Sequence, residues 1–258
     1  MLNFGALALA LARQDLQDRF AGSALGTTWL FIWPLVQLFI YIVIFGKLMG
    51  ARLGMDSHAF SYGFYIAAGL LSWTYFAGSL TLCARSFIDR RHIIRKVNVE
   101  LAVLPAAACL SEMLPFGAGL ILLVCADLAA GWQPAPFWCA MLIPAFYCQT
   151  ILAFGFGLFL ACAAVFARDV AEATAICLQM AFWFTPIVYL PGILPDWLAG
   201  ILWLNPMCAI TGIFQNCFIL NAAPDWLAIC YAALVSHIAL GLGLFTLARM
   251  RKDVRDVL

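Results

Sequence analysis

Long apolar runs, separated by short polar or proline-rich stretches, occupy most of this chain. A helix needs about 20 apolar residues to cross a hydrocarbon core of roughly 30 Å. The runs that reach or approach this length cover residues 27–46, 60–84, 101–130, 137–167, 171–190 and 226–248. The pattern therefore predicts an all-α membrane protein, in which six transmembrane helices form a single transmembrane domain over residues 1–258.

A short amphipathic helix is predicted before the first run, over residues 6–22. Leu9, Ala12, Leu16 and Phe20 share one helical face, and charged and amide side chains occupy the other face. Such a helix lies in the membrane interface instead of crossing the membrane. A water-exposed helix is the alternative interpretation.

The stretch between the fifth and sixth crossings, residues 191–225, is apolar but broken by prolines. These are Pro191, Pro195, Pro206 and Pro224. Because proline ends or kinks a helix, no piece between them is long enough to cross the membrane. We expect two short helices, over 196–204 and 206–220, that dip in from the outer face as a re-entrant hairpin. A plain interfacial loop is the competing interpretation.

Lysine and arginine side chains are unevenly divided between the two ends of the predicted helices. Of 14 such residues, only Lys47 and Arg52 fall on one side. The others are Arg13, Arg19, Arg85, Arg90, Arg91, Arg95, Lys96, Arg168, Arg249, Arg251, Lys252 and Arg255. Because cytoplasmic loops carry an excess of these residues, we expect both termini, the segment 85–100 and the tail 249–258 to be cytoplasmic.

Composition supports membrane insertion and argues against several kinds of site. Hydrophobic residues make up 66% of the chain and charged residues 10%, whereas soluble domains contain roughly 45–50% and 25%. The net charge of +1 gives no reason to expect a nucleic-acid partner. The 10 cysteines contain no CxxC pair, and the three histidines lack ligands at metal-binding spacing. We therefore expect no metal site and interpret the cysteines as packing residues.

The segment 85–100 is the most polar stretch in the interior of the sequence. Phe87, Ile88 and Ile94 would form an apolar knob on a short amphipathic helix. Its rim would contain Asp89, Arg90, Arg91, His92, Arg95 and Lys96. A helix of this kind suits docking into a groove on a soluble partner. Charge that only fixes the topology is the alternative.

Aromatic and polar residues recur every four positions along the first crossing and form one row on a helix. The row consists of Trp29, Trp33, Gln37, Tyr41 and Phe45. Sugars stack their apolar C–H faces on aromatic rings while their hydroxyls form hydrogen bonds, so such a row could border a path for sugars. Trp29 and Phe45 are better explained as interfacial residues, and packing remains the alternative for the others. The candidate path residues are Trp33, Gln37, Tyr41, Tyr65, Trp73, Gln179 and Trp183.

Glu112 lies well inside the third predicted crossing. An unpaired charge at this depth would cost several kcal/mol, so its carboxyl must be protonated, paired or in contact with water. The sequence does not identify a partner. His237 is one possibility, and a local structural hydrogen bond is the more economical interpretation. Pro105 and Pro115 could bend this helix toward a neighbour.

Short motifs along the chain indicate a family. Residues 15–46 contain Asp15, Arg19, Phe20, Ser23, Leu25, Gly26, Trp29 and Pro34. The motifs AGLLSWTYF at 68–76, IIRKV at 93–97, FARDV at 166–170, TPIVY at 185–189 and LNP at 204–206 follow. This order resembles that of ABC-2 type permeases that export polysaccharides, including O-antigen, capsule and teichoic acid permeases. Residues 98–100 depart from the pattern, where a more aromatic or proline-containing approach to the third helix is expected.

The resemblance implies a homodimer of this subunit, bound to two copies of a separate ABC nucleotide-binding ATPase. It places the coupling helix in the segment 85–96 and an outer gate in 191–225. The sequence lacks the GxxxxGK[ST] motif. We therefore expect no cofactor on this chain, and expect ATP and Mg²⁺ on the partner subunit.

The function implied is export of a lipid-linked polysaccharide across the inner membrane of a bacterium, by a transporter subunit that is not itself an enzyme. An ABC-2 exporter of a drug or simple lipid is one alternative. An integral membrane enzyme of lipid or sugar metabolism is another, although it would need convergent His, Asp or Glu residues near one interface. A passive channel is the third, and it would have no associated ATPase.

Overall fold

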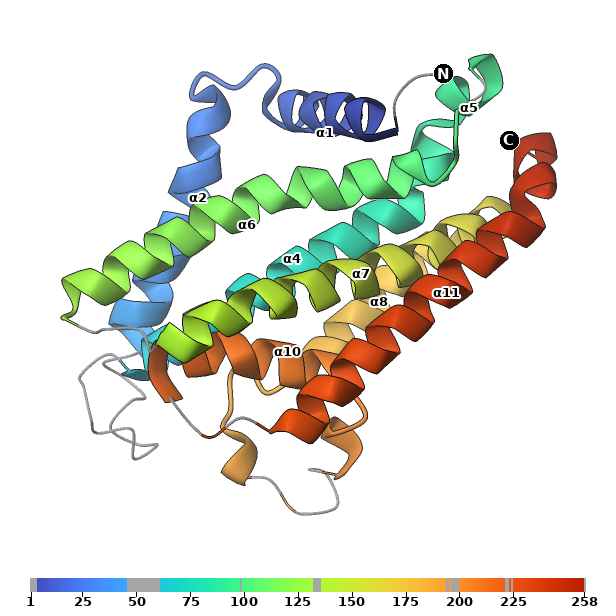
Figure 1. Cartoon of the computed structure of the whole chain (residues 1–258). Helices are drawn as coiled ribbons and strands as arrows, with labels where there is room; N and C mark the ends of the chain where they lie inside the picture. Colours follow the sequence, from blue (N-terminus) through green and yellow to red (C-terminus); the bar gives the residue numbers. More distant parts are fainter. Residues whose placement is uncertain are drawn as a thin grey trace.

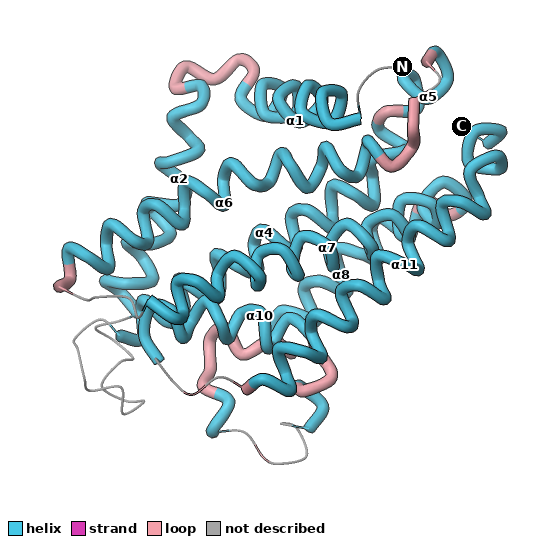
Figure 2. Tube along the Cα trace, in the orientation of Figure 1, coloured by secondary structure: helices cyan, strands magenta, loops and turns pink. Residues whose placement is uncertain are grey.

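The computed structural model describes residues 4–45, 61–97, 99–131, 136–193, 195, 200–220, 223 and 225–257. Throughout this part of the chain, the regular secondary structure is helical (Figure 2). The long helices are α4 (Ser61–Asp89), α6 (Val103–Ala129), α7 (Pro136–Phe166) and α11 (Trp226–Val257). In Figure 1 they run in the same general direction, and α8 (Asp169–Trp183) follows them.

Five stretches of the described chain are long and apolar enough to cross a membrane. They are Gly26–Phe45 and the helices α4, α6, α7 and α11. The predicted fifth crossing, 171–190, differs from expectation because its helix α8 ends at Trp183 after 15 residues. At 1.5 Å per residue, α8 is only about 22 Å long. Pro186 explains the early end, since the residue before a proline is disfavoured in helical conformation.

The most extensive contact between two described helices joins α7 and α11. A Cβ atom added at Gly155 would lie 2.4 Å from the backbone nitrogen of Leu240, and one at Gly243 would lie 2.3 Å from the carbonyl oxygen of Gly155. The two backbones therefore touch directly, which larger side chains would prevent. Small residues allow this close approach between membrane helices, where packing replaces the hydrophobic effect as the main attraction.

Helix α1 (Phe4–Phe20) lies across one end of the bundle and packs against α6 (Figure 1). Its buried residues Ala8, Leu11 and Ala12 join a cluster that also contains Leu104 of α6 and Leu247 of α11. The short helix η1 (Gly26–Thr28) then leads into α2 (Trp29–Phe39), which continues as the π-helix η2 (Ile40–Phe45). The predicted interface helix therefore sits as a separate element beside the start of the first span.

The opposite end of the bundle carries η4 (Pro191–Ile193), α10 (Pro206–Gln215) and the π-helix η5 (Asn216–Leu220) (Figure 1). Asn205 caps α10 by accepting a hydrogen bond from the backbone nitrogen of Met207, and proline follows at the first helical position. Of the other predicted short helix, 196–204, residues 200–202 are helical and residues 203–204 form a turn, whereas residues 196–199 lie outside the described residues. Lys47 and Arg52 also lie outside them.

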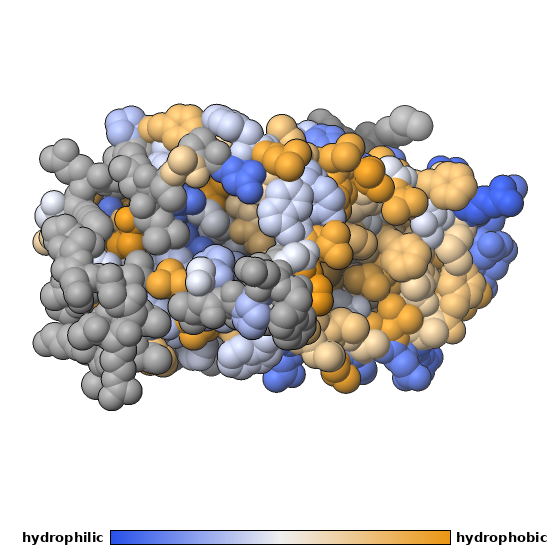
Figure 3. Space-filling model, turned by 90° about the horizontal axis from the view of Figure 1, so that it is seen from below, coloured by the Kyte–Doolittle hydropathy of each residue, from blue (hydrophilic) through white to orange (hydrophobic). Residues whose placement is uncertain are grey.

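The end that carries the start of α1 also carries α5 (Arg91–Lys96) and the end of α11 (Figure 1). The predicted tail 249–258 is helical there as far as Val257, as a continuation of α11. Seen from below, the described surface is largely hydrophobic, and hydrophilic residues gather at its right-hand end, the end of α5 and the C-terminus (Figure 3). Such a surface is typical of a protein embedded in lipid, with polar groups at the membrane boundary.

Candidate functional site

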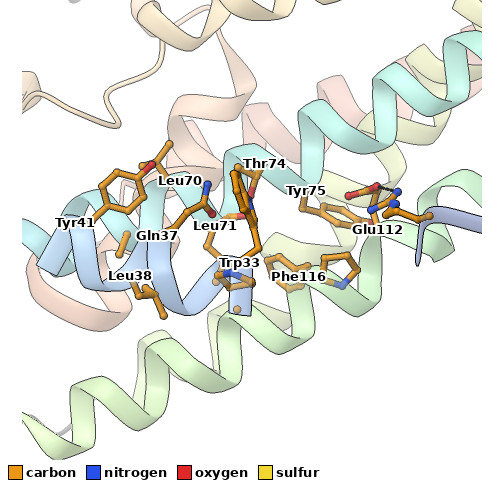
Figure 4. A pocket seen from close by; sticks show the side chains of 15 residues that line it. Trp33, Gln37, Leu38, Tyr41, Leu70, Leu71, Thr74, Tyr75, Glu112 and Phe116 are labelled. Atoms are coloured by element: carbon orange, nitrogen blue, oxygen red, sulfur yellow. Dashed lines mark hydrogen bonds and ion pairs between the residues drawn. The ribbon is translucent and has the colours of Figure 1, made fainter. Parts of the chain in front are cut away.

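A cavity of about 240 Å³ lies between α2, α4 and α6. Trp33 and Gln37 of α2 and Tyr41 of η2 line it, so the structure brings these three predicted path residues together. Figure 4 shows them along one wall, with side chains from neighbouring helices around them. Their four-residue spacing places them on one helical face, which explains why they share a cavity.

The facing wall of this cavity is also aromatic and polar. Thr74 and Tyr75 come from α4, and Phe116 comes from α6 (Figure 4). The rings of Tyr75 and Phe116 have centroids 5.3 Å apart, and the Tyr75 hydroxyl lies 2.9 Å from the Thr150 hydroxyl. Tyr75 and Phe116 are thus fixed by packing, and Tyr75 also by a hydrogen bond. The cavity combines rigid rings with a few neutral hydrogen-bonding groups.

An ion pair stands at one end of the cavity. Arg19, near the end of α1, donates a hydrogen bond of 2.6 Å to the Glu112 carboxylate of α6. The Glu112 side chain is 13% exposed and the Arg19 side chain 37%. Glu112 is therefore paired, as required for a charge at this depth. His237 is not its partner: this histidine contacts Tyr147 and the Ala233 carbonyl oxygen.

A second, more open hollow of about 740 Å³ lies between α4 and α8. It contains three further predicted path residues, Trp73, Gln179 and Trp183. The ring of Trp73 packs edge-on against Phe182, with centroids 5.9 Å apart. Arg19 and Glu112 line this hollow as well as the first cavity. The ion pair therefore stands where the two spaces adjoin.

Tyr65 does not line either space. Its side chain is fully buried, and its hydroxyl lies 2.9 Å from the carbonyl oxygens of both Pro186 and Tyr189. Gln215 of α10 also donates a hydrogen bond to the Pro186 carbonyl, at 2.9 Å. Tyr65 therefore holds the non-helical segment after α8. This is a correction to its predicted place beside a path.

The coupling segment has a different arrangement from the predicted apolar knob with a basic rim. Phe87 is fully buried and Ile94 is 5% exposed, and both pack into the cluster formed with α1 and α11. The physical reason is that α4 continues to Asp89, so Phe87 belongs to the bundle and not to a free loop. Ile88 is half-buried. The described residues of the segment 85–100 that are exposed are Arg85, Asp89, Arg91, His92, Arg95, Lys96, Val97 and Glu100.

Polar contacts connect the residues on either side of α5 to neighbouring helices. Arg90, directly before α5, donates to the Asp15 carboxylate of α1. Arg255 of α11 donates a hydrogen bond of 2.6 Å to the carbonyl oxygen of Val99. Arg85 of α4 pairs with Glu172 in the first turn of α8. The segment 85–99 is thus connected to α1, α8 and α11.

Sequence reasoning assigned no cavity role to several residues that the structure places around the ion pair. Arg19 was interpreted only as a topology charge and as part of a family motif, because 93 residues separate it from Glu112. Thr74 and Tyr75 belong to the family motif at 68–76, which did not indicate a cavity. Phe116 carried no signal, since aromatic residues in spanning helices usually pack. The sequence contains one clue to the ion pair, which is an arginine at the end of the interface helix together with an acidic residue inside a spanning helix.

The described helices and their polar, aromatic-lined spaces define a multi-pass membrane protein. Comparison with known proteins shows which kind: the family described as ABC-2 type transporter matches residues 6–219. This match covers most of the chain, which therefore belongs to the ABC-2 type transporter family.

Individual relatives are similar over most of their length. An O-antigen export system permease protein of Myxococcus xanthus is 27% identical over 93% of this chain and 90% of its own. One of Klebsiella pneumoniae is 25% identical over 95% and 93%. An inner membrane transport permease of Escherichia coli K12 is 26% identical over 74% of this chain and 76% of its own.

Proposed function

We propose that this chain is the membrane-spanning permease subunit of an ATP-driven exporter, and that its cargo is a lipid-linked polysaccharide. The observation that carries this proposal is the similarity to O-antigen export permeases over more than nine-tenths of the chain. The similarity to the Escherichia coli transport permease covers a smaller share of the chain. The membrane is the inner membrane of a bacterium, and this chain transports without catalysing a reaction.

The topology that we propose has six crossings and both termini in the cytoplasm. The fifth of these crossings in chain order consists of α8 together with the non-helical residues 184–190. Non-helical backbone at membrane depth is tolerated where protein covers it, and the contacts of Tyr65 and Gln215 provide such cover. With 10 residues, α10 is too short to cross the membrane; we propose that it belongs to a re-entrant outer gate.

The proposed path for the cargo follows the two spaces beside the ion pair. Trp33, Gln37 and Tyr41 line the first space, and Trp73, Gln179 and Trp183 line the second. Aromatic faces offer many weak contacts to sugar rings, and the amides offer hydrogen bonds. Because no single contact is strong, a polymer can move along such a surface without being trapped.

We propose two partner proteins. One is an ABC nucleotide-binding ATPase, which carries ATP and Mg²⁺ and docks at the exposed residues of α5. The other is a second copy of this chain. No described residue of α2 is buried within one subunit, and its exposed side chains include Trp29, Trp33 and Val36. A homodimer in which α2 faces the other subunit would place the path residues of both copies around one passage.

Deletion of the gene in its native bacterium tests the function. Polysaccharide should disappear from the cell surface, and lipid-linked polymer should accumulate inside the inner membrane, as measured by glycan labelling of intact cells and extracted lipids. Plasmid-borne wild-type protein is the control. Unchanged surface polysaccharide together with a new sensitivity to small hydrophobic compounds would instead support a drug exporter. The ATPase partner is tested by its co-purification with the tagged permease.

A further inference from the structure

Arg19 occupies a special position among the spaces of the described structure. It lines the cavity between α2, α4 and α6, the open hollow beside α8, and a third space of about 380 Å³ next to α1 and α2. Among the described residues that line these three spaces, the only charged ones are Arg19 and Glu112. The remaining polar groups are neutral, and they include Gln37, Thr74 and Gln179.

We propose that Arg19 is the binding residue for the phosphate group of a lipid headgroup, and that Glu112 occupies this site while no cargo is bound. The inference rests on the proposed function, because a lipid that carries a glycan through a phosphate ester presents an anion beside the sugar. Arg19 would hold that anion, and the neutral aromatic walls would receive the sugar.

The position of Arg19 suits a lipid headgroup. It lies near the end of α1, the amphipathic helix that we expect in the membrane interface, where headgroups are found. Its side chain is 37% exposed, so an incoming anion can reach the guanidinium without prior unfolding. A guanidinium binds phosphate through two parallel hydrogen bonds, and Arg is better suited than Lys to this geometry.

Glu112 has the properties of an internal substitute for the ligand. It presents a carboxylate to Arg19 at 2.6 Å and is largely shielded from solvent. Gly78 of α4 makes room for it, because a Cβ atom there would lie 2.8 Å from a carboxylate oxygen of Glu112. A phosphate with more negative charge than one carboxylate can compete for the guanidinium. The displaced Glu112 would then face the open hollow, which Thr81 and Gln179 also line.

Exchange of Glu112 for a lipid phosphate predicts that substitutions of the two residues change lipid binding in opposite directions. A purely structural ion pair would not give this result. Removing Arg19 should weaken binding of a lipid phosphate, whereas removing the charge of Glu112 should strengthen it. If the pair only held α1 against α6, both changes would lower stability and neither would tighten binding.

The experiment measures equilibrium binding of radiolabelled undecaprenyl diphosphate to the full-length permease in nanodiscs. Undecaprenol, which lacks the phosphates, and inorganic pyrophosphate, which lacks the lipid, serve as competitors. The variants are Arg19→Gln, Arg19→Lys, Glu112→Gln and Gly78→Ala. Arg85→Gln is the matched control, because Arg85 also pairs with a glutamate but does not line these three spaces. Thermal melting of each variant verifies folding.

We expect Arg19→Gln to weaken binding about tenfold or more, as the loss of a charge-assisted pair predicts. Arg19→Lys should retain part of the affinity, because lysine keeps the positive charge but cannot form the two parallel hydrogen bonds of a guanidinium. Glu112→Gln and Gly78→Ala should tighten binding, and Arg85→Gln should leave it unchanged. Unlabelled undecaprenyl diphosphate should compete well, and undecaprenol poorly.

Three outcomes would overturn the inference: equal competition by undecaprenol, unchanged affinity in folded Arg19→Gln, or weaker binding in folded Glu112→Gln. Strong competition by inorganic pyrophosphate at matched concentration would show a site for free phosphate, and would overturn the assignment to a lipid. These outcomes are separate from failure of the proposed function. That failure would appear as unchanged surface polysaccharide in the deletion strain, whatever the binding data show.

Discussion

The contact between α7 and α11 and the face formed by α2, α4 and α8 are built in opposite ways. At the first, the backbones touch at Gly155 and Gly243, and apolar side chains fill the surroundings. At the second, aromatic rings, amides and one ion pair line spaces between the helices. Close packing fixes one half of the subunit. The open face leaves room for a cargo without losing the fold.

The largest expected effect comes from Gly243→Leu. Its side chain would enter the space of the Gly155 carbonyl oxygen, which lies 2.3 Å from an added Cβ. Overpacking of this kind costs about 1–3 kcal/mol or more, and we expect a sharp fall in folded yield and melting temperature. Gly241→Leu on the same helix is the control, because no atom outside the helix lies within 4 Å of its Cβ position. Equal loss in both variants would contradict the backbone contact.

The next effect concerns the open face. Trp33→Ala combined with Tyr41→Ala should lower export on the order of tenfold, equivalent to ~1.4 kcal/mol, because two stacking surfaces are lost. Folding should be nearly unchanged, since neither side chain is fully buried. Surface glycan per folded permease is the measurement. Phe31→Ala, which removes an exposed aromatic side chain of the same helix, should export normally. An equal loss of export in Phe31→Ala, or no loss of export in the double variant, would contradict the aromatic path.

The smallest effect is expected at the end of the bundle that carries α5. Arg91→Glu combined with Arg95→Glu reverses exposed charges on α5 and should weaken co-purification of the ATPase severalfold, with unchanged stability of the permease. The structure separates these residues from Arg90, whose pairing with Asp15 makes it a poor probe of docking. Arg251→Glu with Lys252→Glu is the control for nonspecific charge effects. Equal loss of ATPase in both double variants would argue against α5 as the docking element.

The sequence alone was informative where the physics is local. Hydrophobic length predicts the long helices, and helical spacing places Trp33, Gln37 and Tyr41 on one face. The pairing of Arg19 with Glu112 could not be predicted, because it depends on how α1 lies across α6. The burial of Phe87 could not be predicted either, because the charged residues that follow it predict a separate segment where α4 in fact continues. Pro186 indicates that the helix ends near Trp183. The apolar run, however, continues to residue 190 and predicts a longer helix.

The hydrogen bonds to the segment after α8 also bear on which helices beside the proposed path can move. Tyr65 of α4, Asn205 at the N-cap of α10 and Gln215 at the last residue of α10 all donate hydrogen bonds to the segment after α8. Helix α2 buries no residue within the subunit. When the space beside it widens, we therefore expect α2 to move, and α4, α8 and α10 to keep their positions.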